Sequence, residues 1–213
     1  MDWTYGGLYQ KYEMDKELHI GTGIVKVHDI FKPIPDFMKQ ADFVISDPPY
    51  NSSALSGFYT KAGIAEKPKS FDALVERFFE VIDEISPKMI CLEVGEPQTE
   101  VFLEYVKQRF SENIIMESYY YGNKRNVCNM IFASNIGIPE CVKHVPFFDE
   151  EKFIKYLCEN VDFECVADPF MGLGLVAYYA NKNGKKFVGT ELNKYRLAVC
   201  VERVVTNQRG KIR

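Results

Sequence analysis

Short apolar runs and longer amphipathic stretches alternate along this chain. Strands five or six residues long are predicted at 41–46, 88–93, 163–167 and 186–190, and a further short strand at 23–28, where apolar and polar residues alternate weakly. Helices are predicted between and after them, over 71–85, 98–110, 149–159, 175–182 and 194–206. Strands that alternate with helices predict an α/β fold: a doubly wound, mostly parallel sheet with helices on both faces.

Two segments depart from this alternation. Residues 113–121 and 126–133 flank Gly122-Asn123, a pair typical of hairpin turns, and predict one antiparallel hairpin strand at an edge of the sheet. Residues 51–70 are rich in Ser, Gly, Ala and Lys and predict a loop.

The composition is that of one globular domain covering residues 1–213. Hydrophobic residues make up 46% and charged residues 26%, and there is no repeat or Pro/Ser-rich linker. No apolar run is long enough to span a membrane, and the amino terminus lacks the layout of a signal peptide. The six cysteines form no C-x-x-C pair and the three histidines have no metal-ligand spacing. We therefore expect a cytoplasmic protein with reduced thiols and no metal.

A glycine turn follows the fourth predicted strand. The sequence runs from Asp168 through Phe170 to Gly172 and Gly174, and glycines here let the backbone approach a ligand closely. Glu191 ends the next strand 23 residues after Asp168, a spacing at which a carboxylate meets ribose hydroxyls. There is no third glycine and no Walker lysine, so the site suits a nucleoside without a pyrophosphate, such as S-adenosylmethionine.

A second motif, Asp47-Pro48-Pro49-Tyr50, ends the second predicted strand. Proline at 48 holds Asp47 extended, so that the Asp47 carboxylate and the Pro48 carbonyl can present two acceptors to one cleft. Two acceptors that bind the N–H groups of an aromatic amine localise its nitrogen lone pair and stabilise the charge that develops on nitrogen. Tyr50 can stack on a base that has left its helix. The motif predicts chemistry on the exocyclic amine of a base.

Together these motifs resemble the DNA amino-methyltransferases, the N6-adenine and N4-cytosine enzymes. Their catalytic motif, (D/N/S)-P-P-(Y/F/W), is matched by residues 47–50, and their cofactor motif, D-P-F-x-G-x-G, by residues 168–174. The catalytic motif comes first here, which resembles the circularly permuted group called beta.

The resemblance covers residues 23–203. It implies a Rossmann-like S-adenosylmethionine-dependent methyltransferase with a catalytic half at about 23–135 and a cofactor-binding half at about 149–206. It also implies that Asp29 lies near the cofactor adenine and Phe170 near its methionine or adenine.

Three features depart from that family. The span 134–148 is too short for the usual target-recognition insert, the usual K-P pair is replaced by Phe147-Phe148-Asp149, and Leu175-Val176 replaces the Ser/Thr-rich continuation of the glycine turn. Without the insert we expect low sequence specificity, or a second subunit, most simply a homodimer. The remaining candidates for nucleic-acid contact are 51–70, as a mobile lid carrying Lys61, Lys67 and Lys69, the hairpin residues Tyr119, Tyr120, Tyr121, Lys124 and Arg125, and the basic tail from 203 to 213.

The favoured prediction is methylation of adenine N6 in DNA through Asp47, Pro48, Pro49 and Tyr50. An RNA base is the first alternative, because D-P-P-Y also occurs in guanine-N2 methyltransferases of ribosomal RNA. Cytosine N4 is a further alternative, although that chemistry more often has Ser at the position of Asp47. A catalytically silent partner subunit is an alternative of a different class. The net charge of -4 does not choose between them.

Overall fold

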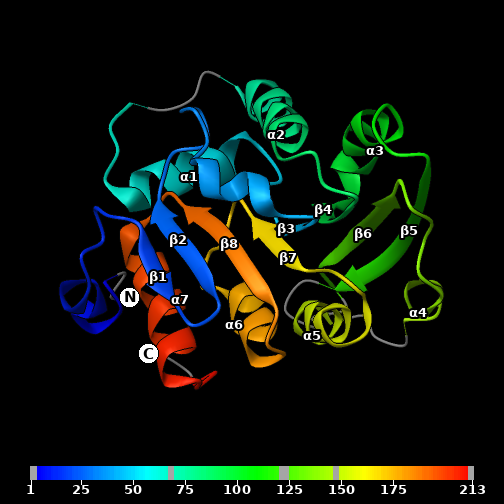
Figure 1. The fold of residues 1–213 in the computed structure, drawn as a ribbon. Helices are drawn as coiled ribbons and strands as arrows, with labels where there is room; N and C mark the ends of the chain where they lie inside the picture. The colour runs from blue at the N-terminus through cyan, green and yellow to red at the C-terminus, as the bar shows by residue number, and fades with distance from the viewer. Residues whose placement is uncertain (1–3, 67–69, 120–124, 146–148, 211–213) are drawn as a thin grey trace.

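The centre of the molecule is an eight-stranded sheet with the strand order β1-β2-β8-β7-β3-β4-β6-β5 (Figure 1). A computed structural model describes residues 4–66, 70–119, 125–145 and 149–210. The strands are β1 (Leu18–Ile20), β2 (Gly23–Val27), β3 (Phe43–Ser46), β4 (Met89–Gly95), β5 (Glu112–Tyr119), β6 (Val127–Ser134), β7 (Cys165–Asp168) and β8 (Lys186–Glu191).

The middle of the sheet is parallel, as predicted, because β2, β8, β7, β3 and β4 all run in the same direction. β6 is the predicted antiparallel hairpin strand, but it does not lie at the edge. It pairs with β4 on one side and β5 on the other, so β5 is outermost and runs parallel to the central strands. The short strand β1, which the sequence pattern did not predict, pairs antiparallel with β2 at the opposite edge.

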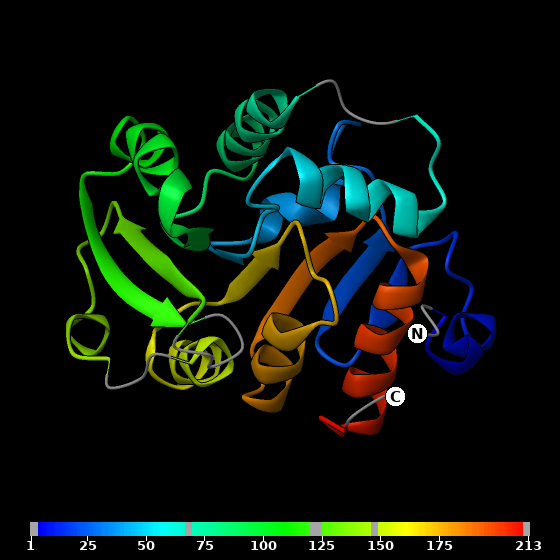
Figure 2. The same cartoon turned by 180° about the vertical axis from the view of Figure 1, so that it is seen from behind.

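Helices cover both faces of the sheet (Figures 1 and 2). One face packs against α5 (Glu150–Asn160), α6 (Leu175–Lys182) and α7 (Lys194–Thr206), and the other against α1 (Ser52–Ala62), α2 (Phe71–Ile85) and α3 (Thr99–Lys107). The short elements are the 3-10 helices η1 (Tyr5–Lys11), η2 (Asp36–Gln40) and η3 (Glu96–Gln98), and the one-turn helix α4 (Glu140–Lys143).

Alternate residues of the central strands point into the two apolar layers. On β3, Phe43 and Ile45 pack with α5, α6 and α7, whereas Val44 packs with α1, α2 and α3. All four β3 side chains are buried, which is why the strand is a continuous apolar run in the sequence. None of the described helices is long and apolar enough to cross a membrane.

The prediction of a loop over 51–70 was wrong for its first half, which forms helix α1. The side chain of Asn51 caps the helix by accepting a hydrogen bond from the Ala54 N–H at 2.9 Å. Leu55 and Tyr59, one turn apart, are buried and anchor α1 to the apolar layer. The Ser, Gly and Thr residues on its exposed side obscured this spacing. The predicted mobile lid is therefore in part a packed helix, and Lys67 and Lys69 lie outside the described residues.

After the neighbouring strands β3 and β7, the chain continues toward opposite edges of the sheet. From β3 it continues through α1 and α2 to β4, whereas from β7 it continues through α6 to β8 on the other side. β3 and β7 are paired in parallel, with Phe43 opposite Val166 and Val44 opposite Ala167. A crevice forms beyond the carboxyl ends of strands at such a topological switch point. The fold thus brings residue 47 and residue 168 to the same edge of the sheet.

Candidate active site

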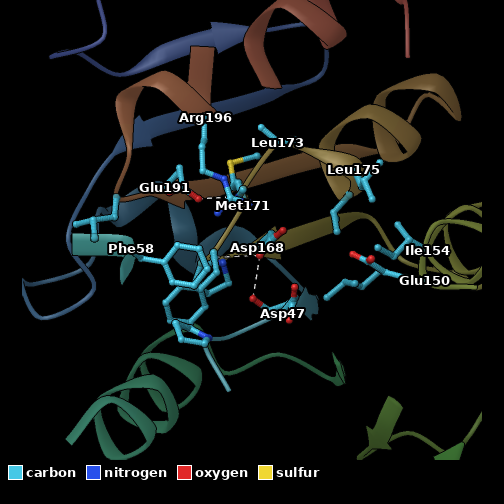
Figure 3. A pocket seen from close by; sticks show the side chains of 18 of the residues that line it. Asp47, Phe58, Glu150, Ile154, Asp168, Met171, Leu173, Leu175, Glu191 and Arg196 are labelled. Carbon is cyan, nitrogen blue, oxygen red and sulfur yellow. Dashed lines mark hydrogen bonds between the residues drawn. The ribbon is translucent and has the colours of Figure 1, made fainter. Parts of the chain in front are cut away.

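A cavity of about 380 Å³ lies at this switch point, which is within the range of small-molecule sites. Both predicted motifs contribute to its walls (Figure 3). The sequence-predicted residues that line it are Asp29, Asp47, Pro49, Asp168, Phe170, Gly172 and Glu191. Pro48, Tyr50 and Gly174 are not among the lining residues: Pro48 and Gly174 are buried, and Tyr50 is half-buried.

The glycine turn (residues 171–174) requires glycine at two positions. Gly172 has a φ of 52° and Gly174 a φ of 79°, the left-handed region that favours glycine. A Cβ at Gly174 would lie 2.3 Å from Cys200 Sγ, so a side chain there would collide with α7. A Cβ at Gly172 would lie 2.9 Å from Arg196 Nη2 at the cavity wall. The turn therefore packs tightly on α7 at Gly174, and at Gly172 the absence of a side chain leaves backbone in the cavity wall.

Glu191 closes this turn from β8. Its Oε2 accepts a hydrogen bond from the Gly172 N–H at 2.6 Å, and its Oε1 accepts one from the Asn193 N–H at 2.9 Å. Burial raises the pKa of the Glu191 carboxyl. The positive charge of Arg196 and these N–H donors act in the opposite direction and limit the rise. The role predicted from the sequence was a contact with ribose hydroxyls. Each carboxylate oxygen keeps acceptor capacity after one hydrogen bond, so the residue can hold the turn and still meet a diol.

Asp168 connects the two motifs. The carboxyl group is buried, and its Oδ1 accepts hydrogen bonds from Ser46 Oγ at 2.8 Å and from the Phe170 N–H at 3.0 Å. Burial raises the pKa of Asp168 to about 7. Since Ser46 directly precedes Asp47, this contact fixes the start of one motif against the end of β7.

The proline turn (residues 47–50) is held by the end of β4. Pro48 and Pro49 are buried and Asp47 is partly exposed to the cavity. The Tyr50 hydroxyl donates to Glu93 Oε1 at 3.3 Å, and a Cβ at Gly95 would lie 3.4 Å from the Tyr50 Cβ. The Tyr50 ring is therefore supported by the backbone of β4 on one side.

Two acidic residues near Asp47 were missed by the sequence reasoning. Glu93 is 2% exposed and also accepts a hydrogen bond from Cys128 Sγ at 3.1 Å. Burial, and then the charge of Asp47, raise the pKa of Glu93 to about 9. The same two causes raise the pKa of Glu150, the first residue of α5 and a lining residue, to about 8. A carboxylate at the end of the apolar run 88–93 was the one local signal for Glu93. Nothing local marked Glu150.

At the other end of the cavity, α1 contacts residues that follow β2 and β8. The Tyr59 hydroxyl donates to Asp29 Oδ1 at 2.7 Å, and Asn193 Nδ2 donates to the Lys61 carbonyl at 3.1 Å. The Arg196 guanidinium lies 5.3 Å from the centre of the Phe58 ring. Phe58 and Tyr59 line the cavity and were not predicted, because residues 51–70 were assigned to a loop.

Several predicted nucleic-acid contacts lie outside the described residues: Lys67, Lys69, Tyr120, Tyr121, Lys124 and residues 211–213. The Phe147-Phe148 pair also lies outside them. Arg125 and Lys61 are exposed, and the Tyr119 hydroxyl donates to Glu117 at 2.6 Å. The predicted basic surface therefore stays a prediction.

Comparison with solved structures identifies the fold. The chain is similar to M1.HpyAVI, with a TM-score of 0.58 and 14% identity over 84% of this chain and 97% of that one. It is similar to TTHA0409 from Thermus thermophilus, described as a candidate DNA modification methylase, with a TM-score of 0.59 and 15% identity over 87% and 95% of the two chains. The cytosine-N4-specific PvuII DNA methyltransferase matches with a TM-score of 0.52 and 10% identity over 89% and 94%.

No family profile and no curated protein sequence matches the chain. At these low identities the structural similarity establishes the fold, which is the α/β fold of these methyltransferases.

Proposed function

We propose that this protein transfers a methyl group from S-adenosylmethionine to the exocyclic amine of a nucleic-acid base, with adenine N6 in DNA the favoured target. The observation that carries the proposal is the meeting of two distant motifs in one cavity. Asp47 follows β3 and Gly172 follows β7. Because these two strands are neighbours in the sheet, both residues lie at the switch point.

The cavity has features that fit the donor. Gly172 presents backbone in the cavity wall, and Glu191 and Asp29 place carboxylates at the end lined by Phe58 and Tyr59. A carboxylate there favours a ribose diol and repels a phosphate. M1.HpyAVI and TTHA0409 have both been solved with S-adenosylmethionine, which supports the same donor for this chain. Phe170, between the turn and α2, is proposed to contact the donor as well.

The donor supplies an electrophilic methyl group on a sulfonium. Asp47 and the Pro48 carbonyl would accept hydrogen bonds from the amine N–H groups, which localises the nitrogen lone pair. The methyl carbon would bond to the amine nitrogen as its bond to the sulfonium sulfur breaks, which would leave a neutral thioether, and the proton that the nitrogen loses would pass to solvent water. Tyr50, supported by Gly95 and Glu93, would stack on the base and offset part of the cost of its extrusion.

The chain order supports membership of the circularly permuted group, since β3 precedes β7 although the two pair in the sheet. We propose that residues 1–213 form one domain, with the catalytic half at 23–135 and the cofactor-binding half at 149–206. We also propose that a homodimer or a second subunit enlarges the surface for nucleic acid, and that the protein acts in the cytoplasm.

One assay tests this function. The protein is incubated with methyl-labelled S-adenosylmethionine and separate pools of DNA and RNA, and the products are digested to nucleosides. We expect label in N6-methyl-2′-deoxyadenosine from the DNA pool. Label in N4-methyl-2′-deoxycytidine, or only in the RNA pool, would correct the substrate. No transfer to any pool, by a protein that is folded, would favour the silent-subunit alternative.

A further inference from the structure

One buried acidic side chain beside the proline turn has no part in the proposed methyl transfer. Glu93, near the carboxyl end of β4, is 2% exposed and is not among the residues that line the cavity. Its Oε1 accepts two hydrogen bonds, one from the Tyr50 hydroxyl at 3.3 Å and one from Cys128 Sγ at 3.1 Å. Burying a carboxyl group costs free energy unless it is hydrogen-bonded, and here one of its two partners belongs to the predicted catalytic motif.

The contact with Cys128 continues into the antiparallel strands. Cys128 on β6 lies opposite Gly95 of β4 and opposite Ser118 of β5. The side chains of Cys128 and Ser118 are hydrogen-bonded, and both residues are buried. Three strands and the proline turn therefore share one polar network, which runs from Ser118 through Cys128 and Glu93 to Tyr50. A buried network whose members are hydrogen-bonded to one another makes the groups at its ends rigid.

The Tyr50 side chain is held at both of its ends. A Cβ at Gly95 would lie 3.4 Å from Cβ and from Cδ2 of Tyr50, so the backbone of β4 limits the movement of the ring near its attachment to the chain. At the far end the hydroxyl donates to Glu93. Stacking on a base needs only the face of an aromatic ring, which phenylalanine would also supply. The hydroxyl adds the contact to Glu93, and this contact fixes the direction in which the ring points.

The carboxyl group that holds the hydroxyl is neutral. Burial, and then the charges of Asp47 and Glu150, raise the pKa of Glu93 to about 9, so that the group is protonated at pH 7. A neutral acid can anchor the Tyr50 hydroxyl without adding a second negative charge beside the Asp47 carboxylate. Glutamine, which is also neutral and has a similar shape, should therefore be able to replace it.

We infer that Glu93 is a positioning residue for methyl transfer, which acts through the Tyr50 hydroxyl and holds the Tyr50 ring in the orientation that stacks on an extruded base. The inference rests on the proposed function and adds to it the residue that orients the aromatic platform. A ring that is fixed before the base arrives loses less conformational entropy when the base stacks on it. The benefit should be greatest with duplex DNA, where stacking offsets part of the cost of extrusion.

Four variants of the full chain test whether Glu93 acts through the hydroxyl. Glu93→Met removes the acceptor and keeps the length of the side chain, and Tyr50→Phe removes the hydroxyl and keeps the ring. The third variant combines these two changes, and the fourth, Glu93→Gln, keeps a neutral acceptor. The matched control is Glu96→Gln, at an exposed glutamate just after the end of β4. For each protein, kcat/KM is measured on a mixed-sequence DNA duplex and on its separated strands, and S-adenosylhomocysteine affinity is measured by calorimetry.

We expect Glu93→Met and Tyr50→Phe each to lower kcat/KM on the duplex by about fivefold, the scale of one hydrogen bond, and to lower it less on the separated strands. The double variant should be no worse than either single variant, because both changes remove the same hydrogen bond. Glu93→Gln should recover most of the loss, and Glu96→Gln should match the wild type. The affinity for S-adenosylhomocysteine should stay the same throughout.

Losses that multiply in the double variant would overturn the inference, because Glu93 would then act independently of the hydroxyl. A wild-type rate for Tyr50→Phe on the duplex would overturn it as well, and this result can be obtained even if Glu93→Met does not fold. Equal losses on duplex and separated strands, or a Glu93→Gln variant as weak as Glu93→Met, would mean that Glu93 only maintains the fold. A folded wild type that methylates neither substrate would refute the proposed function itself, a result distinct from an active wild type without the coupling.

Discussion

The glycine turn and the proline turn are both strand-to-helix connections at one edge of the sheet, but they treat their buried carboxyl groups differently. At the glycine turn, Glu191 accepts backbone N–H groups from Gly172 and Asn193. At the proline turn, Asp47 faces Glu93 and Glu150, and each of these two has its pKa raised by burial and by the charge of Asp47. The first site is internally satisfied before a ligand arrives. The second keeps two carboxyl groups protonated beside Asp47, and a cationic ligand would favour their ionised forms.

From this difference we expect the glycine turn and the proline turn to act in different steps. The hydrogen bonds of Glu191 fix the shape of the glycine turn, so that little reorganisation is needed when the donor binds. The acidic groups near Asp47 are instead held in their protonated form by burial and by the charge of Asp47, and a transition state with positive charge on nitrogen would favour their ionised form. We therefore expect mutations at the glycine turn to change the affinity for the donor, and mutations at the proline turn to change the rate of methyl transfer.

The largest effect is expected at Asp47. Asp47→Ala removes an acceptor for the target amine but leaves the glycine turn and Glu191 in place. We expect methyl transfer to fall by at least ~10²-fold with little change in donor affinity. Single-turnover rates and calorimetry measure the two quantities. Asp47→Asn should lose less, since its amide oxygen still accepts a hydrogen bond. A wild-type rate for Asp47→Ala would remove the proline turn from the mechanism.

The next effect concerns stability and pH. Glu93 has a folded-state pKa of about 9 against an ordinary value of 4.5, so between pH 6 and 8 it is protonated in the folded protein and ionised in the unfolded chain. Folding then takes up a proton, and this residue lowers the stability as pH rises through that window, by up to about 1.4 kcal/mol per pH unit.

Glu93→Gln removes that titration. We expect the free energy of unfolding of the variant to fall less steeply from pH 6 to pH 8 than that of the wild type, as measured by denaturant unfolding at each pH. Glu150 and Asp168 contribute slopes of the same sign in both proteins, because their pKa values are raised to about 8 and about 7. Identical slopes for variant and wild type would show that Glu93 is ionised in the folded state.

The smallest effect is expected on the other side of the comparison. Glu191→Ala leaves the Gly172 and Asn193 N–H groups without their acceptor and removes the contact proposed for the ribose. Donor binding should weaken by about 1–3 kcal/mol, and the variant should also unfold at lower temperature. Calorimetry and thermal unfolding measure these effects. An unchanged donor affinity in a folded variant would mean that Glu191 holds the turn without touching the ligand.

The sequence alone determined the elements with strong local signals. Helix α2 begins and ends as its apolar period predicts, and α6 and α7 match their predicted bounds. The proline turn and the glycine turn were found because prolines end a buried strand and glycines permit left-handed backbone, both of which are local effects. These signals need no knowledge of distant residues.

Only the tertiary structure decided which segments meet. β3 and β7 pair although more than a hundred residues separate them, so that no local pattern could place Asp47 beside the glycine turn. The same holds for Glu150 near Asp47 and for Arg203 and Arg209 in the wall of the cavity. Helix α1 was missed because its stability comes from the burial of Leu55 and Tyr59 rather than from composition. Local chemistry sets strands, turns and caps, whereas long-range packing sets the electrostatic surroundings of each carboxylate.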